Sequence, residues 1–339
     1  MVLKEMALTR GVSGDEGCIR RFILEKIGDL ADDVRVDRIG NILATRRARQ
    51  KPNGRHALIG AHMDEVGLIV TGINDNGLLS YEPVGGIDSR VVVSKRVRVG
   101  ENALPGVIGA KAIHLQSAEE RTQVLKHDKL FIDIGAKDKA AAEKLVSPGD
   151  YASFDSQWVE FGDGLVKCKA LDDRVGCMTL LSALEGDYPC DLTCAFTVQE
   201  EIGLRGARVA GHQVDVDCAI ALEGTTANDL GDVPEALRVC DVGKGVAISF
   251  MDNSSIAHPG LTHALRSLAE AHGIPWQVKR FVAGGNDAGA FQTARGAVPT
   301  AVLSVPCRYI HSPSSVASFK DIEAQYRLVD AFLQNGATF

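Results

Sequence analysis

The pattern that most constrains the fold is an alternation of helical and buried-strand segments that a stretch of different character interrupts. Segment 11–30 has apolar residues at Ile19, Ile23 and Ile27, a helical spacing, with Ser13 or Asp15 as the expected helix cap. Buried-strand and helical patterns then alternate again from residue 161 to a last helix over 319–336. This alternation predicts an α/β fold with helices on both faces of a mainly parallel central sheet, a layered α/β/α domain.

Segment 71–160 has the different character. Short β-branched runs are separated there by Gly, Pro and Asp turns, with a single helical pattern over 137–145. This composition predicts a small β-barrel inserted into the α/β domain. We therefore expect a discontinuous α/β domain of residues 1–70 and 161–339, with residues 71–160 as the inserted barrel.

Charge and composition exclude several classes of function. The chain has 339 residues and a formal net charge of −7, which argues against a nucleic-acid partner. No run of about 18 apolar residues is present, and residues 1–10 lack the apolar core of a signal peptide. The eight cysteines are scattered, without metal-binding spacing. We expect no membrane partner and a reducing, cytoplasmic location.

Polar residues able to bind metal follow the predicted strands at four places. These places are 61–65 (AHMDE), 199–201 (QEE), 222–224 (LEG) and 308–311 (RYIH), and a fifth cluster at 171–174 (LDDR) opens a predicted helix. Functional groups of open α/β sheets gather beyond the carboxyl ends of the strands. We therefore expect these clusters to meet in one site.

The residue types in these clusters suit a pair of divalent cations. Any one of them alone is more often a helix cap or a surface charge, but five together favour a site. Imidazole nitrogen and carboxylate oxygen are ligands for zinc, cobalt or manganese, and one carboxylate can bridge two ions about 3.5 to 4 Å apart. The candidate ligands are His62, Asp172, Glu201, Glu223 and His311.

Two further acids have expected roles beside the ligands. Asp64 follows His62 by two residues, so strand geometry places both on one side and lets the carboxylate orient the imidazole. Glu200 and Glu201 are adjacent, so one can bind metal while the other stays free as a general base.

A series of motifs along nearly the whole chain resembles the M42 family of metallo-aminopeptidases. The motifs are, in order, SGDEG, GN, AHMDEVG, SPGD, ALDDRVG, QEEIGLRGA, AGGNDAG and VPCRYIHSP. The resemblance implies that His62 and Glu223 bind one metal ion and that Glu201 and His311 bind the other. It also implies that Asp172 bridges the ions, that Glu200 is the general acid and base, and that Asp64 orients His62.

The resemblance carries three further expectations. Segment 71–160 is implied to serve dimerisation and assembly, which predicts a homo-oligomer, either a dimer or a dodecamer. Asp287, in the loop 284–288, is expected to contact substrate, although the same glycine-rich loop also suits a simple turn. The sequence departs from the family at Glu223, where related enzymes often have Asp, so the mode of ligation there stays open.

These residues together predict an aminopeptidase with two divalent metal ions, in which Glu200 moves protons and no covalent adduct forms. One alternative is a metal-independent glycoside hydrolase, which would keep working after chelation. The other alternative is a metal-stabilised peptide-binding scaffold without catalysis, which the intact Glu200 disfavours. The preferred N-terminal side chain of the peptide substrate and the physiological metal stay open at this stage.

Overall fold

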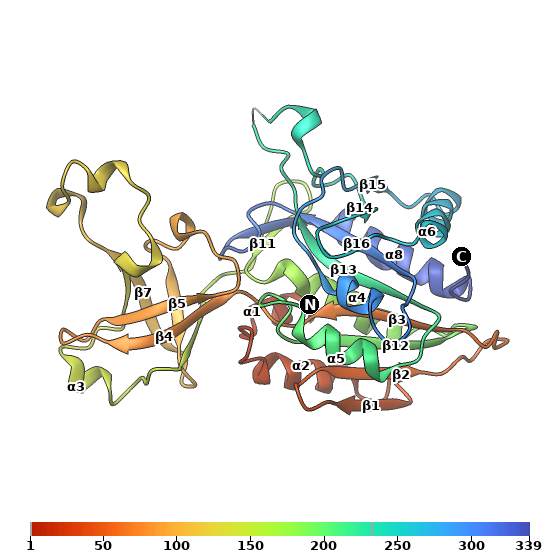
Figure 1. Cartoon of the computed structure of the whole chain (residues 1–339), viewed down its shortest axis with the longest axis horizontal. Helices are drawn as coiled ribbons and strands as arrows, with labels where there is room; N and C mark the ends of the chain where they lie inside the picture. The colour runs from red at the N-terminus through yellow and green to blue at the C-terminus, as the bar shows by residue number, and fades with distance from the viewer. Residues whose placement is uncertain (1, 232) are drawn as a thin grey trace.

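The structure, a computed structural model, describes residues 2–231 and 233–339. Residues 1 and 232, which belong to the two expected segments of the α/β domain, lie outside the described residues. Figure 1 shows a large α/β domain and, beside it along the long axis, a smaller barrel that contains β4, β5 and β7.

An eight-stranded sheet forms the centre of the α/β domain. Its four inner strands pair in parallel, whereas strand pairs near both edges include antiparallel ones. This mixed, mainly parallel sheet confirms the predicted fold class. In spatial order the strands are β1 (Asp33–Val36), β2 (Ile42–Arg46), β12 (Asp191–Thr197), β3 (His56–His62), β13 (Cys218–Thr226), β16 (Thr300–Cys307), β14 (Val246–Ser249) and β15 (Trp276–Val278).

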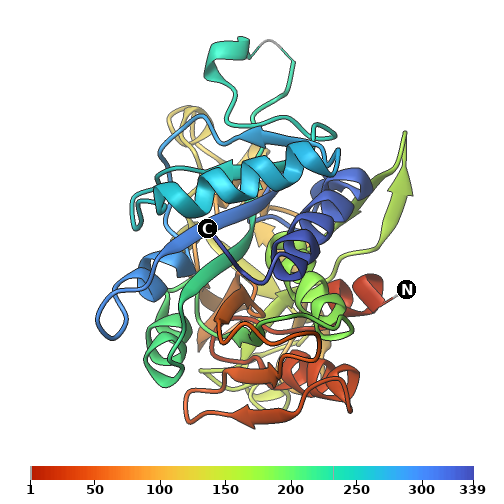
Figure 2. The same cartoon turned by 90° about the vertical axis from the view of Figure 1, so that its right-hand side faces the viewer.

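Helices cover both faces of this sheet because its inner strands are apolar on both sides. Ile59 and Leu58, neighbours on β3, belong to two separate apolar clusters on opposite faces. The Ile59 cluster receives α2 (Gly17–Ile27), α4 (Leu171–Leu184), α6 (Pro259–Ala271) and α8 (Phe319–Gln334), and the Leu58 cluster receives α5 (Arg205–Gln213) and α7 (Asp287–Gln292). Figure 2 shows α6 and α8 over one side of the sheet, and α1 (Val2–Leu8) packs against α4.

The inserted barrel is a closed, antiparallel sheet of six strands. Leu68, Val97, Ile108 and Ile132 fill its interior and are fully buried. The barrel confirms the predicted insertion of a small β-structure into the α/β domain. Its strands, in the order in which they pair, are β4 (Gly67–Ile73), β5 (Leu79–Val84), β8 (Leu130–Asp133), β7 (Leu104–Ala110), β6 (Arg96–Val99) and β9 (Tyr151–Phe154).

Several short elements complete the described chain. The helical pattern over 137–145 gives only one turn, α3 (Lys139–Ala142), which Asp138 caps and which ends before Pro148 and Gly149. A separate antiparallel sheet consists of β10 (Val159–Phe161), β11 (Leu165–Cys168) and β17 (Ser315–Ser318). Short 3₁₀ turns lie at Ser89–Val91, Ile113–Leu115, Glu120–Thr122, His127–Lys129 and Glu235–Leu237.

Within the described residues, no helix combines the length and the apolar character that crossing a bilayer would require.

Candidate active site

The candidate site lies at the carboxyl edge of the four inner strands. His62 is the last residue of β3, Glu200 and Glu201 follow β12, Glu223 lies near the end of β13, and His311 follows β16. Because β12, β3, β13 and β16 are parallel neighbours, their carboxyl ends share one edge of the sheet. This shared edge brings together residues that are as far apart in sequence as His62 and His311.

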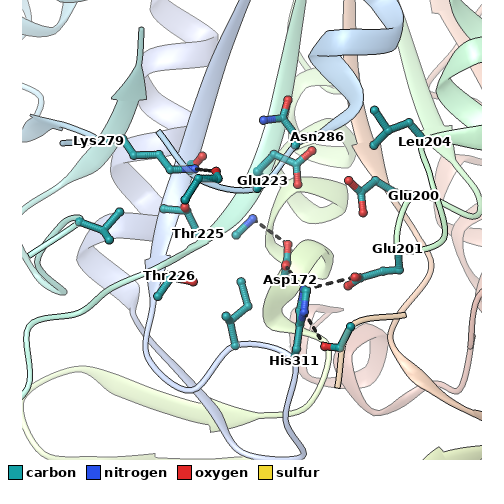
Figure 3. A pocket seen from close by; sticks show the side chains of 18 of the residues that line it. Asp172, Glu200, Glu201, Leu204, Glu223, Thr225, Thr226, Lys279, Asn286 and His311 are labelled. Atoms are coloured by element: carbon teal, nitrogen blue, oxygen red, sulfur yellow. Dashed lines mark hydrogen bonds and ion pairs between the residues drawn. The ribbon is translucent and has the colours of Figure 1, made fainter. Parts of the chain in front are cut away.

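Asp172, at the start of α4, lies between the two imidazoles. Its Oδ1 is 3.3 Å from Nε2 of His62, and its Oδ2 is 3.6 Å from Nε2 of His311. Glu223 Oε2 is 3.7 Å from Nε2 of His62, whereas Glu201 Oε2 is 3.2 Å from Nε2 of His311. Figure 3 shows Asp172 and His311 in the centre of this group, with Glu201 on one side and Glu223 above. All five residues expected as ligands therefore lie together.

Gly224 allows Asp172 to approach the edge of β13. The Gly224 amide donates a hydrogen bond of 2.9 Å to Asp172 Oδ1. A Cβ atom at position 224 would lie 2.8 Å from Cβ of Asp172, closer than such atoms normally come. Gly224 therefore helps to fix the position of the Asp172 carboxylate.

The buried acids of this cluster fit divalent cations. Oε1 of Glu223 is buried and has no hydrogen-bond partner among the described residues. Burial, followed by the charge of Glu200, raises the pKa of Glu223 well above its usual range, because a buried carboxylate without a counter-charge is unfavourable. A set of imidazole nitrogens and carboxylate oxygens matches the ligands of borderline divalent ions. A cation bound here would pair with the free oxygen of Glu223.

Asp173 also belongs to the cluster, although the amino-acid sequence did not distinguish a metal ligand from a helix-capping residue at this position. One carboxylate oxygen accepts the Gly176 amide at 3.0 Å, and the other is buried without a hydrogen-bond partner among the described residues. Two overlapping groups have ligand atoms within 4.8 Å of one another: His62, Asp172 and Glu201, and His62, Asp173 and Glu223. The Asp-Asp pair at the start of α4 was the only signal that could have pointed to Asp173.

Asp64 is fully buried and connects the two sides of the site. Its Oδ1 lies 3.6 Å from Nδ1 of His62, and its two oxygens accept the backbone amides of Glu200 and Glu201 at 3.1 and 3.2 Å. Ser13 donates a hydrogen bond of 2.6 Å to the same carboxylate. Asp64 thus contacts the ring of His62 and the backbone of both adjacent glutamates.

The expected cap of the first long helix was wrong. The α2 helix begins at Gly17 after Glu16, whose side chain forms no capping hydrogen bond. The hydroxyl of Ser13 is instead directed to Asp64, because the backbone of Ser13 is held beside Glu65 by a hydrogen bond of 3.2 Å. The Ser13 hydroxyl therefore bonds to a residue that is distant in the sequence and does not cap the nearby helix.

Asn41, directly before β2, anchors the loop that carries Glu200 and Glu201. The buried Asn41 side chain accepts the Val198 amide at 3.0 Å and donates to the Gly206 carbonyl at 2.9 Å. These two bonds fix both ends of the loop 198–206. A buried amide group that satisfies two backbone groups holds the loop in one conformation.

Three residues at or beside the candidate ligands have a left-handed backbone conformation. Ala170, Gln199 and His311 have φ angles of 53°, 56° and 57°, in the left-handed region that non-glycine residues rarely adopt. Each lies within two residues of Asp172 or Glu201, or is itself a candidate ligand. Such strain persists where the surrounding structure fixes the backbone, as it commonly does at functional sites.

Glu200 differs from Glu201 in its contacts. Glu201 lies against His311, whereas the side chain of Glu200 has no ion pair or hydrogen bond to another described residue. Burial raises the pKa of Glu200 well above its usual range despite the nearby His62, and the charges of Asp287 and Glu201 add to this increase. A free carboxyl group at the edge of the cluster is suited to exchange protons with a substrate.

A cavity of about 630 Å³ opens beside the cluster. Asp172, Glu200, Glu201, Glu223 and His311 all line it. A space of this volume is adequate for a small ligand or for the end of a peptide.

Asp287 lies close to this cavity but is fully buried. Its carboxylate accepts a hydrogen bond from Thr197, and the neighbouring Asn286 lines the cavity instead. The Asn286 amide donates to Asp252 at 2.7 Å, which fixes the loop 284–286 at the cavity wall. Contact between Asp287 and substrate stays a prediction.

A cluster of imidazoles and carboxylates at the carboxyl edge of a parallel sheet, beside a cavity, is typical of metal-dependent hydrolases. A family model described as M42 glutamyl aminopeptidase matches residues 40–328. The chain therefore belongs to the M42 peptidase family, whose members are metallopeptidases.

Relatives with different names align with this chain along most of its length. A protein of Acetivibrio thermocellus assigned to the aminopeptidases is 37% identical over 331 residues, covering 97% of this chain and 96% of the relative. The lysyl aminopeptidase of Pyrococcus furiosus is 32% identical, covering 98% and 96%. The glutamyl aminopeptidase of Lactococcus lactis is 31% identical, covering 95% and 92%. These relatives support hydrolysis at the N-terminus of peptides.

Solved structures show the same fold. An aminopeptidase of the archaeon Desulfurococcus kamchatkensis has a TM-score of 0.93 at 33% identity, covering 98% of this chain and 93% of its own. The TET1 peptidase of Pyrococcus horikoshii, described as able to assemble into a tetrahedron or a large octahedral shell, has a TM-score of 0.86 at 36% identity, with 98% of both chains covered. A Thermotoga maritima protein named endoglucanase has a TM-score of 0.82 at 36% identity, covering 98% and 97%.

Proposed function

We propose that the protein is an aminopeptidase that uses two divalent metal ions to release the N-terminal residue of peptides. The observation that supports this most directly is the position of Asp172, which presents one oxygen to His62 and the other to His311. A carboxylate placed in this way is suited to bridge two ions. Glu200, beside the pair, is the free acid that proton transfer requires.

In this proposal His62 and Glu223 hold one ion, Glu201 and His311 hold the other, and Asp172 is shared. The distances of 3.7 Å between His62 and Glu223 and of 3.2 Å between His311 and Glu201 support this pairing. When bound, zinc, cobalt or manganese ions would polarise the scissile carbonyl group and lower the pKa of a water molecule.

The side chains of the protein supply the proton transfers and the orientation. Glu200 accepts a proton from the attacking water and passes it to the amino group that leaves, so no covalent adduct with the protein is needed. The backbone carbonyl of Asp64 lies 3.2 Å from Nδ1 of His62 and orients the ring, with Oδ1 of Asp64 3.6 Å away, and the Asp64 carboxylate accepts the backbone amides of Glu200 and Glu201. One buried residue therefore fixes the geometry between a ligand and the proton-transfer group.

Chelation tests the proposed metal dependence. The purified protein would be treated with a chelator, dialysed, and supplied separately with zinc, cobalt or manganese. We expect release of the first residue from short peptides and aminoacyl-anilides to fall at least about 100-fold on chelation and to return with one or more ions. Full activity after verified removal of metal would contradict the proposal.

The endoglucanase name of one structural neighbour makes glycoside hydrolysis the second candidate. Two carboxyl groups suffice for that chemistry, and the imidazoles of His62 and His311 would have no task in it. The same chelated samples, assayed on soluble cellulose, separate the candidates. Polysaccharide cleavage that persists without metal would favour a glycoside hydrolase, and bound peptide recovered uncleaved in the presence of metal would favour a scaffold.

We also propose that segment 71–160 mediates assembly into a homo-oligomer and that the protein is cytoplasmic. The excursion between β7 and β8 exposes Ile113, Leu115 and Val124 by 69%, 64% and 59%, and apolar side chains exposed together favour a protein contact. The description of the Pyrococcus horikoshii neighbour supports the same idea. All eight cysteines are free, which fits a reducing compartment.

Light scattering on the purified protein tests the assembly. We expect a mass of at least twice the 36.2 kDa of the chain. Replacing Ile113, Leu115 and Val124 together by serine should lower this mass, whereas replacing Leu237, an apolar residue exposed by 55% outside the barrel, should not. A mass of one chain for the unchanged protein at micromolar concentration would contradict the proposal.

A further inference from the structure

A loop of the inserted barrel reaches the candidate metal cluster. Residues 85–88 follow β5, and the carbonyl oxygen of Gly86 lies 2.9 Å from Nδ1 of His311. A carbonyl oxygen can only accept a hydrogen bond, so Nδ1 carries the proton and the lone pair of the neutral ring lies on Nε2. Nε2 is the nitrogen that faces Asp172 and Glu201. The barrel therefore determines which nitrogen of His311 is available to a metal ion.

His311 depends on this hydrogen bond more than His62 depends on any one contact. The side chain of His311 is 35% exposed, whereas that of His62 is 1% exposed and is held by packing on all sides. Figure 3 marks the contact of the His311 ring with Glu201. On the opposite side of the ring, Gly86 is the only hydrogen-bond partner within the described chain. The position of the Gly86 carbonyl group therefore sets the orientation of an otherwise loosely packed ligand.

The loop 85–88 has little support from its own backbone. Gly85 has a φ angle of 86° and is followed by a second glycine, a pair that allows many backbone conformations. Neither Gly86 nor Ile87 forms a hydrogen bond with another backbone group of the described residues. The Ile87 side chain packs against the barrel interior, and its carbonyl oxygen lies 3.0 Å from Nε2 of His127. The contact with His127 thus fixes the peptide groups next to the Gly86 carbonyl.

His127 has a second partner that directs its proton to this loop. It lies in the 3₁₀ turn His127–Lys129 before β8, and its Nδ1 is 3.2 Å from the hydroxyl group of Tyr81. Tyr81 is 3% exposed, and burial raises its pKa to about 12, so the hydroxyl group stays protonated and donates to Nδ1. The proton of the neutral His127 ring is then on Nε2, where it donates to the Ile87 carbonyl oxygen.

We infer that His127, a residue of the barrel, positions His311 for metal binding by holding the loop that carries the Gly86 carbonyl group. This inference rests on the proposed two-metal site. His127 does not line the cavity, so it acts through the loop 85–88 and touches no reacting atom.

Calorimetry with zinc on the chelated protein tests this role. His127→Leu removes the hydrogen-bond donor, and we expect the affinity for one of the two ions to fall about tenfold, the lower end of the effects that partners of metal-ligating histidines have. The other ion should bind as before. His127→Gln keeps an N–H donor at a similar reach and should restore the affinity to within about twofold. His263→Leu, at an exposed histidine of α6, is the matched control and should change neither affinity.

A double variant identifies the ion that is weakened. Glu201→Gln disables the half of the cluster near His311, so adding His127→Leu to it should not lower zinc affinity further, because both changes act on the same ion. Three results would overturn the inference, since each indicates a general structural role for His127. They are an equal loss of affinity for both ions, an undiminished effect of His127→Leu in the Glu201→Gln protein, and a failure of His127→Gln to restore binding.

Hydrogen exchange of the metal-free protein provides a measurement that needs neither ions nor turnover. We expect faster exchange of the amides of residues 85–88 in His127→Leu, with the barrel strands unchanged. If this variant does not fold, Tyr81→Phe takes its place, because it removes only the donor to Nδ1 of His127. It should accelerate exchange in the same loop and weaken the same ion about twofold to threefold. An unchanged loop and unchanged zinc affinity would overturn the inference.

The results for the proposed function and for this inference can be separated. Two bound zinc ions and release of N-terminal residues, neither of which depends on His127, would overturn the inference while the proposed function stands. Two ions of which one depends on His127, without hydrolysis of any peptide or anilide, would support the positioning role and contradict the aminopeptidase.

Discussion

Replacing Glu200 by glutamine is expected to lower kcat for N-terminal residue release by about 10²- to 10⁴-fold, the usual contribution of general acid–base catalysis. The amide has the same shape as the carboxyl group but cannot accept a proton from water and pass it to a leaving amine. The Glu200 side chain forms no hydrogen bond or ion pair within the described chain, so this change should not disturb folding. Turnover would be measured with saturating anilide, and metal content by elemental analysis.

Metal content decides how a loss of activity is interpreted. An inactive Glu200→Gln protein with wild-type metal content supports proton transfer by Glu200, whereas an inactive protein that has lost metal would make Glu200 a ligand. Activity close to that of the wild type would remove the proposed role. Glu143→Gln, at an exposed glutamate of the barrel, is the matched control and should change neither quantity.

The candidate ligands could be predicted from the sequence because the strands that carry them are buried on both faces. Such strands appear as continuous apolar runs, so the polar residue that ends each run stands out, as His62 does after a run of buried residues in β3. Parallel pairing then places the ends of these runs at one edge. These two properties bring together four candidate ligands: His62, Glu201, Glu223 and His311. They also predict the layered fold.

Other parts of the site depend on contacts that no local pattern encodes. The hydroxyl of Ser13 bonds to Asp64, 51 residues away, although the local sequence suggested a helix cap. Thr225, in β13, and Lys279, which follows β15, both line the cavity, and neither belongs to a pattern of metal ligands. Asp173 follows Asp172 directly, and only the fold shows where each carboxylate is directed. Long-range packing determined these features.

Asp172→Asn is expected to have the largest effect on metal binding. The change keeps an oxygen that can accept the Gly224 amide, now 2.9 Å from Asp172 Oδ1, but it removes the negative charge shared by the two halves of the cluster. Because the Asp172 oxygens lie 3.3 Å from His62 and 3.6 Å from His311, both ion positions should weaken together. We expect most bound metal to be lost on dialysis and anilide hydrolysis to fall at least about 1,000-fold. Elemental analysis and calorimetry with zinc would measure the loss.

Single changes on either side of Asp172 provide the comparison. Glu201→Gln alters only the half near His311 and should leave one ion bound, so a similar loss in both variants would argue against a shared carboxylate. Retention of both ions by Asp172→Asn with unchanged affinity would exclude Asp172 as the bridge. Asp173 would then become the acid to test, because it lies in the second group of potential ligands with His62 and Glu223. If Asp173 only caps α4 through the Gly176 amide, Asp173→Asn should change stability little, because Asn caps helices about as well as Asp, and should leave metal content unchanged.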